Sequence, residues 1–271
     1  MNDVIRSDAG GSFPALLAVE FRRLGARRLV RILALLAVAA IAVACIIVAV
    51  RSTPPAAGEL AIARTTFELT AVREVLLGLA AIFAILGLLI GATCIGAEWH
   101  AGTMATLLTW EPRRIRVGLA KAASCAGISF LAVLGLEVLL GGLLAGVAAT
   151  RGTTVGADGA WLANTLGIAV RAAAVASALA LVGYALASIG RNTAAALGAG
   201  FVYFAFVEGL IRGLRPQWQP WLVGENSALF IEGGRSLDLG HSSMAAGALI
   251  GVYALVGLAI GVEFLRRRDV T

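Results

Sequence analysis

The chain has 271 residues, of which 59% are hydrophobic and 14% charged, with a mean hydropathy of +0.90 and a formal net charge of +6. Soluble domains are about 45–50% apolar and about 25% charged, so this composition excludes an ordinary soluble protein. Apolar runs continue from residue 32 to residue 265 without a long polar insertion. We therefore expect a single transmembrane domain, residues 1-271.

Six apolar runs are long enough to cross a membrane as helices. A hydrocarbon core of about 30 Å requires about 20 apolar residues in a helix, because only a helix satisfies its own backbone there. The expected spans are Ile32–Val50, Val75–Ala97, Ala122–Ala149, Leu162–Ile189, Ala194–Ile211 and Met244–Phe264. The predicted fold class is an all-α membrane protein with six transmembrane helices.

The basic residues predict the orientation of these spans. Most of the 22 lysines and arginines precede the first span, lie between spans 2 and 3, or follow the last span, and basic loops resist translocation. We expect both termini in the cytoplasm, with residues 1-31 as tail and interfacial helix, 32-265 as the bundle and 266-271 as a short tail. The basic residues lie next to apolar runs, which indicates membrane lipid as the anionic partner and no nucleic acid.

The sequence contains no motif for catalysis or for a cofactor. The only lysine, Lys121, is followed by Ala122 and lacks a phosphate-binding glycine loop, so we expect it to snorkel to the membrane interface. His100 and His241 fall on opposite sides of the expected topology, as solvated interface residues. Cys45, Cys94 and Cys125 lie inside apolar runs and imply neither a metal site nor a disulfide. We expect no enzyme activity, cofactor or metal in this chain.

The segment before the first span has the pattern of an amphipathic helix. Five apolar residues recur at helical spacing, and most of the arginines lie off that stripe, as in a helix that lies on the inner leaflet. The stripe consists of Phe13, Leu16, Leu17, Phe21 and Leu24. Glu20 interrupts it and would need a buried partner. A basic flank that only orients the first span is the alternative.

The segment between spans 2 and 3 predicts a short, rigid cytoplasmic helix. Gly102 is expected to end the second span, and Thr103 can cap a new helix whose apolar face contains Met104, Leu107 and Leu108. Pro112 favours the first turn of the following helix. A short helix held between two spans is suited to transmit force from a partner protein.

These residues carry a resemblance to a known family. The order Glu98, Gly102-Thr103, Leu107-Leu108, Pro112, Arg114 and Lys121, after a span rich in small residues, resembles the type-2 permeases of ABC transporters. The resemblance covers essentially the whole chain, and its strength lies in the combination, since no single motif is specific.

The resemblance implies a six-span subunit of an exporter. It implies an elbow helix over Phe13 to Arg28 and a coupling helix that contacts a separate cytoplasmic ABC ATPase present in two copies. We expect a second permease subunit, as a homodimer, with a heterodimer as the alternative. ATP and Mg would be bound by the ATPase. Short extracellular helices between spans 5 and 6 would match Pro216 to Gly234, with Asn226 as a cap. The coupling residues implied are Glu98, His100, Gly102, Thr103, Met104, Leu107, Leu108, Pro112, Arg113, Arg114 and Arg116.

Three ionisable residues fall within the expected spans. Glu137 and Glu208 lie about 21–22 Å from the inner surface, and Arg171 lies about 27 Å from it, at a rise of about 1.5 Å per residue. A charge at the centre of a span costs about 2.5–3.5 kcal/mol, so each needs a partner or water. The similar depths permit a cluster of Arg171 with one or both glutamates, either as a gate or polar lining of the path or as a static ion pair.

Four Gly-x-x-x-Gly spacings predict tight helix packing: Gly87/Gly91, Gly142/Gly146, Gly247/Gly251 and Gly257/Gly261.

The sequence as a whole predicts the permease subunit of an ATP-driven exporter for an amphiphilic or hydrophobic substrate. A proton-coupled secondary transporter and a non-transporting membrane scaffold or immunity protein are the alternatives.

Overall fold

The computed structural model describes residues 12–52, 66–104 and 113–267. Within these ranges, six helices or helix runs are long and apolar enough to span a membrane, which confirms the expected all-α class. The elements are α1 (Phe13–Gly25), α2 (Arg28–Arg51), β1 (Phe67–Glu68), η1 (Leu69–Ala71), α3 (Val72–His100), α5 (Arg114–Arg151), β2 (Gly152–Thr153), α6 (Gly159–Gly190), α7 (Thr193–Val202), η2 (Tyr203–Val207), α8 (Glu208–Leu214), η3 (Pro216–Trp221), α9 (Val223–Glu232) and α10 (Ser243–Arg267).

Every span is longer than the apolar run that predicted it. The largest difference is in α5, which begins at Arg114, eight positions before the predicted start at Ala122, and has 38 residues. At about 1.5 Å per residue it is about 57 Å long, more than a hydrocarbon core of about 30 Å. Hydropathy locates the lipid-crossing part of a helix, whereas the polar turns at its ends continue the backbone hydrogen bonds beyond it.

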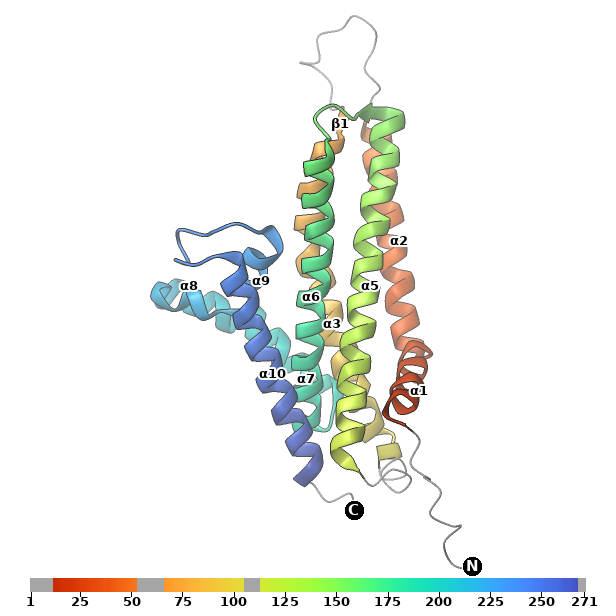
Figure 1. Ribbon diagram of the computed structural model, residues 1–271, viewed down its shortest axis with the longest axis vertical. Helices are drawn as coiled ribbons and strands as arrows, with labels where there is room; N and C mark the ends of the chain where they lie inside the picture. The colour runs from red at the N-terminus through yellow and green to blue at the C-terminus, as the bar shows by residue number, and fades with distance from the viewer. Residues whose placement is uncertain (1–11, 53–65, 105–112, 268–271) are drawn as a thin grey trace, which may run out of the picture.

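The four helices α2, α3, α5 and α6 run side by side as the long part of the molecule (Figure 1). Helix α1 lies at the end where α3 and α10 finish, which we call the α1 end. The short parallel pair of β1 with β2 marks the opposite, β1 end. Helices α7, α8 and α9 extend to one side, and α10 returns beside α6 (Figure 1).

Helices α3 and α6 pack at backbone distance. A Cβ added at Gly87 would lie 2.0 Å from the carbonyl oxygen of Ala176, and one at Gly91 would lie 1.9 Å from that of Ala180. From the other helix, a Cβ at Gly183 would lie 2.3 Å from the oxygen of Leu88. Small residues allow such close approach, which membrane helices use because lipid supplies no hydrophobic drive for their association. The prediction of tight packing is confirmed for the Gly87/Gly91 pair.

The other three glycine pairs do not all pack against a neighbouring backbone as Gly87 and Gly91 do. At Gly142 and Gly146 an added Cβ would meet nothing within 4 Å, so the prediction of close packing is wrong for that pair within the described residues. Gly247 lies against the ring of Phe230, and Gly261 lies against that of Tyr184. A four-residue spacing places two glycines on one face of a helix, but whether another helix covers that face depends on the tertiary structure.

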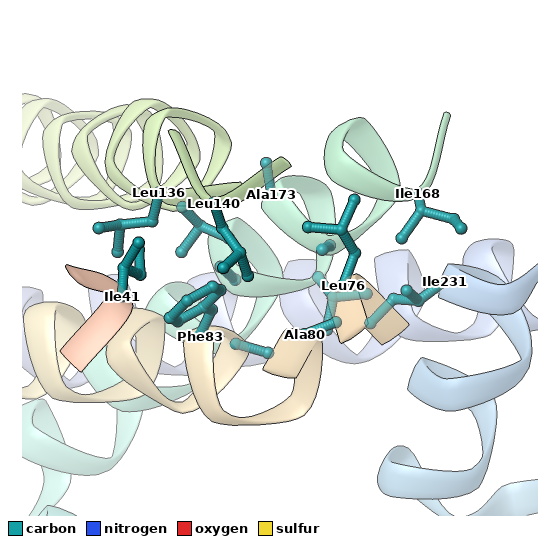
Figure 2. Close-up of a cluster of buried hydrophobic side chains, with 14 of the residues drawn as sticks. Ile41, Leu76, Ala80, Phe83, Leu136, Leu140, Ile168, Ala173 and Ile231 are labelled. Atoms are coloured by element: carbon teal, nitrogen blue, oxygen red, sulfur yellow. The ribbon is translucent and has the colours of Figure 1, made fainter. Parts of the chain in front are cut away.

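The main hydrophobic core is formed by side chains from several spans. Figure 2 shows part of it, with Ile41 of α2, Leu76, Ala80 and Phe83 of α3, Leu136 and Leu140 of α5, Ile168 and Ala173 of α6, and Ile231 of α9. Helix α2 contributes little, since only Ile41 and Cys45 are buried in it. Most of α2 is therefore left to contact lipid or another chain.

The region between the fifth and sixth spans contains short helices, as expected. The fifth span carries a π-helical turn, η2, after which the chain forms α8, η3 and α9. Asn226 does not cap a helix, so that prediction is wrong: α9 already begins at Val223. Its amide instead donates to the carbonyl oxygens of Pro220 (2.9 Å) and Leu222 (2.7 Å). Gly233 and Gly234 follow α9 with positive φ angles of 87° and 86°, a region of backbone conformation open to glycine, and the chain leaves the helix there.

Candidate functional site

A network of buried charges lies beneath α1 and joins three helices. Its members are Glu20 of α1, Glu98 of α3, Lys121 of α5 and Arg27, which directly precedes α2. Glu20, Glu98 and Lys121 are 3%, 2% and 0% exposed, so the network lies inside the protein. We call these four residues the charge network.

Lys121 is the centre of the charge network. Its Nζ lies 2.9 Å from Oε2 of Glu20 and 3.0 and 2.8 Å from the two carboxylate oxygens of Glu98. The prediction that Lys121 snorkels to the interface is wrong, because its ammonium points into the protein toward two carboxylates. Glu20, the residue that interrupts the apolar stripe of α1, therefore has the buried partner that its position required.

Arg27 connects the start of α2 to the end of α3. Its guanidinium donates to the carbonyl oxygens of Thr93 and Cys94, the latter at 3.1 Å, and to Oε1 of Glu98 at 2.6 Å. A planar guanidinium has several donors in fixed directions and can therefore bond two carbonyls and a carboxylate together. These bonds place the α1–α2 junction directly on the last turns of α3.

The charge network is electrically balanced. The carboxylates of Glu20 and Glu98 face the ammonium of Lys121 and the guanidinium of Arg27, while the more exposed Arg23 approaches Glu98 at 3.5 Å. Taking such charges out of water is costly, and close pairing with hydrogen bonds is what offsets the cost. Loss of one partner would leave a buried charge without compensation.

The residues implied to couple to an ATPase fall into two groups. Glu98 and Met104 are buried, so in this structure they brace the segment from within and present no surface to a partner. His100, Gly102, Thr103 and Arg113 are exposed, and Arg114 and Arg116 are half-buried. Gly102 has a φ of 66° and lies two positions after the last residue of α3, where the sequence predicted the end of that helix. Leu107, Leu108 and Pro112 lie outside the described residues.

The intramembrane cluster expected around Arg171 is not formed, so that prediction is wrong for the described residues. The Nε of Arg171 donates to the carbonyl oxygen of Gly167 at 3.1 Å, and its guanidinium lies against Gly233. Glu208 accepts from the backbone N–H of Gly224 at 2.7 Å and lies 3.8 Å from Arg212. Similar depth in the bilayer is therefore not enough to bring side chains of different helices together.

Glu137 is the exception among the intramembrane charges. Its side chain is 0% exposed, and neither carboxylate oxygen has a hydrogen-bond partner among the described residues. It lies on α5 at the border of a cavity between α3, α5 and α6. The position of Glu137 in the sequence indicated that it lies inside a span but did not reveal that no described residue bonds its carboxylate.

His241 also differs from expectation. It is half-buried, and its ring nitrogens lie 2.9 Å from the carbonyl oxygen of Leu239 and 2.8 Å from Oδ1 of Asn226. These contacts hold the chain before α10 against α9. The expectation of a merely solvated His241 is therefore wrong, and no sequence pattern signalled this pair.

Six apolar helices and a buried charge network at one end define a multi-span α-helical membrane protein. No protein-family model matches the chain, and no curated protein matches it.

Proposed function

We propose that this chain is the permease subunit of an ATP-driven exporter of the ABC type-2 class, and that two copies pair in the membrane with two cytoplasmic ATPase subunits. The observation that carries the proposal is the Glu98–Lys121 ion pair. It joins the end of α3 to the start of α5, the two helices that flank the segment resembling a coupling helix.

The charge network supplies a physical route for force. A push on the segment between α3 and α5 moves both helices together, because Lys121 binds Glu98 across them. The same lysine binds Glu20, and Arg27 binds the backbone of α3, so α1 and the start of α2 move with them. Rigid elements joined by ion pairs move as one body, which is what transmission of a partner's motion requires.

The distribution of charge supports a cytoplasmic position of the α1 end. A hollow of about 480 Å³ at this end is bordered by Arg113, Arg114, Arg116 and Arg266. Arginine-rich loops are retained in the cytoplasm, and anionic lipid headgroups of the inner leaflet attract them. In this orientation the ATPase binds at the α1 end, and the β1 end faces outward.

Site-specific photo-crosslinking in cells tests the proposal. A photoreactive amino acid at the exposed position of His100 should crosslink to an ATP-binding protein, whereas the same group at Val155, 81% exposed at the β1 end, should not. The captured complex should hydrolyse ATP, and hydrolysis should respond to His100 substitutions. Crosslinking to no ATP-binding chain from His100, or equal crosslinking from Val155, would reject the proposal.

A proton-driven transporter is the second candidate, and Glu137 favours it. The Glu137 carboxyl group lies inside a span and has no hydrogen-bond partner in the described part of the protein, and carboxyl groups inside spans are a feature of proton relays in transporters. Transport that collapses with a proton uncoupler, and that continues when cellular ATP hydrolysis is blocked, would select this candidate over the exporter.

A further inference from the structure

We propose that the cavity between α3, α5 and α6 binds a lipophilic cation, with the carboxylate of Glu137 as its counter-charge. The inference rests on the proposed function in one respect, since it names the substrate class of that exporter. The binding step itself needs no ATPase and can be tested without one.

The cavity lies toward the β1 end and has a volume of about 570 Å³. Ligand sites for molecules of drug size typically have about 300–1,000 Å³. Its walls are largely apolar, with Leu76 of α3, Val138 and Ala145 of α5, and Leu162 and Leu166 of α6. Val138, Leu162 and Leu166 are each about half exposed on the outside of the bundle, so the cavity opens sideways, where an amphiphile dissolved in lipid would arrive.

Glu137 is the polar group that needs a ligand. Its carboxylate is completely buried and accepts no hydrogen bond among the described residues, while every other buried glutamate there has a cationic or backbone partner. A charge inside a span costs about 2.5–3.5 kcal/mol on insertion scales unless it is paired. A bound cation would supply that pairing after displacing the apolar side chains that cover the carboxylate.

The charge of the cavity selects the sign of the ligand. Its ionisable border residues are Glu137 and Asp158, both acidic, and no lysine or arginine contributes to the described lining. Trp161 also lines the cavity, and indole rings attract cations. Its Nε1–H has no partner within residues 12–52, 66–104 and 113–267 and offers one hydrogen bond to an acceptor on the ligand. An apolar body with one delocalised positive charge fits these walls best.

Direct binding to the purified full chain in zwitterionic lipid nanodiscs tests this inference. Tetraphenylphosphonium is the probe, and tetraphenylborate, which has nearly the same shape and the opposite charge, is its control. We expect saturable binding of the phosphonium and none of the borate. Glu137→Gln should weaken phosphonium binding by at least about tenfold, because a desolvated charge pair is worth more than 1.4 kcal/mol. Glu74→Gln, at a 70% exposed side chain, should leave binding unchanged.

A second pair of variants blocks the cavity without altering a charge. Gly142 borders the cavity and Gly146, one turn further along α5, does not, and an added Cβ at either position meets nothing within 4 Å. We expect Gly142→Leu to abolish phosphonium binding and Gly146→Leu to retain it. Both glycine variants should have the melting temperature of the unmodified chain. The comparison between them therefore remains valid even if Glu137→Gln fails to fold.

The inference is overturned if the borate binds as well as the phosphonium, if phosphonium fails to bind, or if Glu137→Gln and Gly142→Leu both bind it normally. These outcomes leave the crosslinking test at His100 unaffected. Conversely, phosphonium binding together with failure of the His100 crosslinking test would reject the exporter and keep the cation site.

Discussion

The ammonium of Lys121 on α5 lies 2.9 Å from the carboxylate of Glu20 on α1, 101 positions earlier in the chain. This contact shows that α1 is more than a basic flank. It is a helix whose one acidic residue in the apolar stripe reaches into the protein and binds the only lysine of the sequence.

Lys121→Met should strongly destabilise the protein. The substitution keeps the length of the side chain and leaves Glu20 and Glu98 buried without the ammonium between them, which costs about 3–5 kcal/mol. Thermal unfolding in detergent can be followed with a thiol-reactive dye, because Cys45, Cys94 and Cys125 are all buried and free until the chain unfolds. Arg23→Ala is the control, since Arg23 is 41% exposed and 3.5 Å from Glu98 and should contribute no more than about 1 kcal/mol. Equal melting temperatures for Lys121→Met and Arg23→Ala would contradict a structural role of the charge network.

Gly91→Ala should disrupt the contact of α3 with α6. The added methyl group would lie 1.9 Å from the carbonyl oxygen of Ala180, so the helices must separate, at a cost of about 1–3 kcal/mol or more. Gly78→Ala, on the same helix, meets nothing within 4 Å and should be neutral or slightly stabilising. The same thiol-dye assay compares the two. If Gly91→Ala melts as Gly78→Ala does, the helices do not pack at backbone distance.

Asn226→Ala should loosen the connection between α9 and α10. The side-chain amide donates to the carbonyl oxygens of Pro220 and Leu222, and its oxygen lies 2.8 Å from a ring nitrogen of His241; the substitution removes these three contacts and leaves the backbone bond to Leu222 in place. Hydrogen–deuterium exchange should rise over residues 216–242 and stay unchanged in α3 and α6. Ser227→Ala is the matched control, because the neighbouring Ser227 hydroxyl has no partner among the described residues. Similar exchange in both variants would show that the Asn226–His241 contact holds nothing in place.

Cysteines at the two ends should react from opposite sides of the membrane. The native cysteines are buried, so a membrane-impermeant maleimide should label only introduced ones. We expect Val155→Cys to be labelled in intact cells and His100→Cys to be labelled only after the membrane is permeabilised. Both positions are exposed at the surface of the protein. The reverse labelling pattern would show that the topology is opposite to the expected one, with the charge network outside the cell.

The six spans were predictable because length and apolarity are local properties. A run such as Ile32–Val50 has no alternative to a helix in lipid, where its backbone can bond only to itself. The true ends were not predictable in the same way. The sequence of Arg114 to Lys121 indicates a polar flank, yet these residues form the first two turns of α5. Lys121 is buried there by contacts with α1 and α3, which are distant in the sequence and therefore invisible to a local hydropathy pattern.

By itself the sequence determined that this chain crosses a membrane, how many times, and which residues carry charge inside it, since each of these depends on the solvation of one segment. Only the tertiary structure decided that Lys121 binds Glu20 and Glu98, that Arg171 lies apart from Glu137 and Glu208, and that Glu137 has no hydrogen-bond partner in the part of the chain that the structure describes. The reason is geometric. Helical periodicity places a side chain on one face of its own helix, but its partner is chosen by the rotation and packing of the neighbouring helices, which are set by small residues such as Gly87 and Gly91 on other segments.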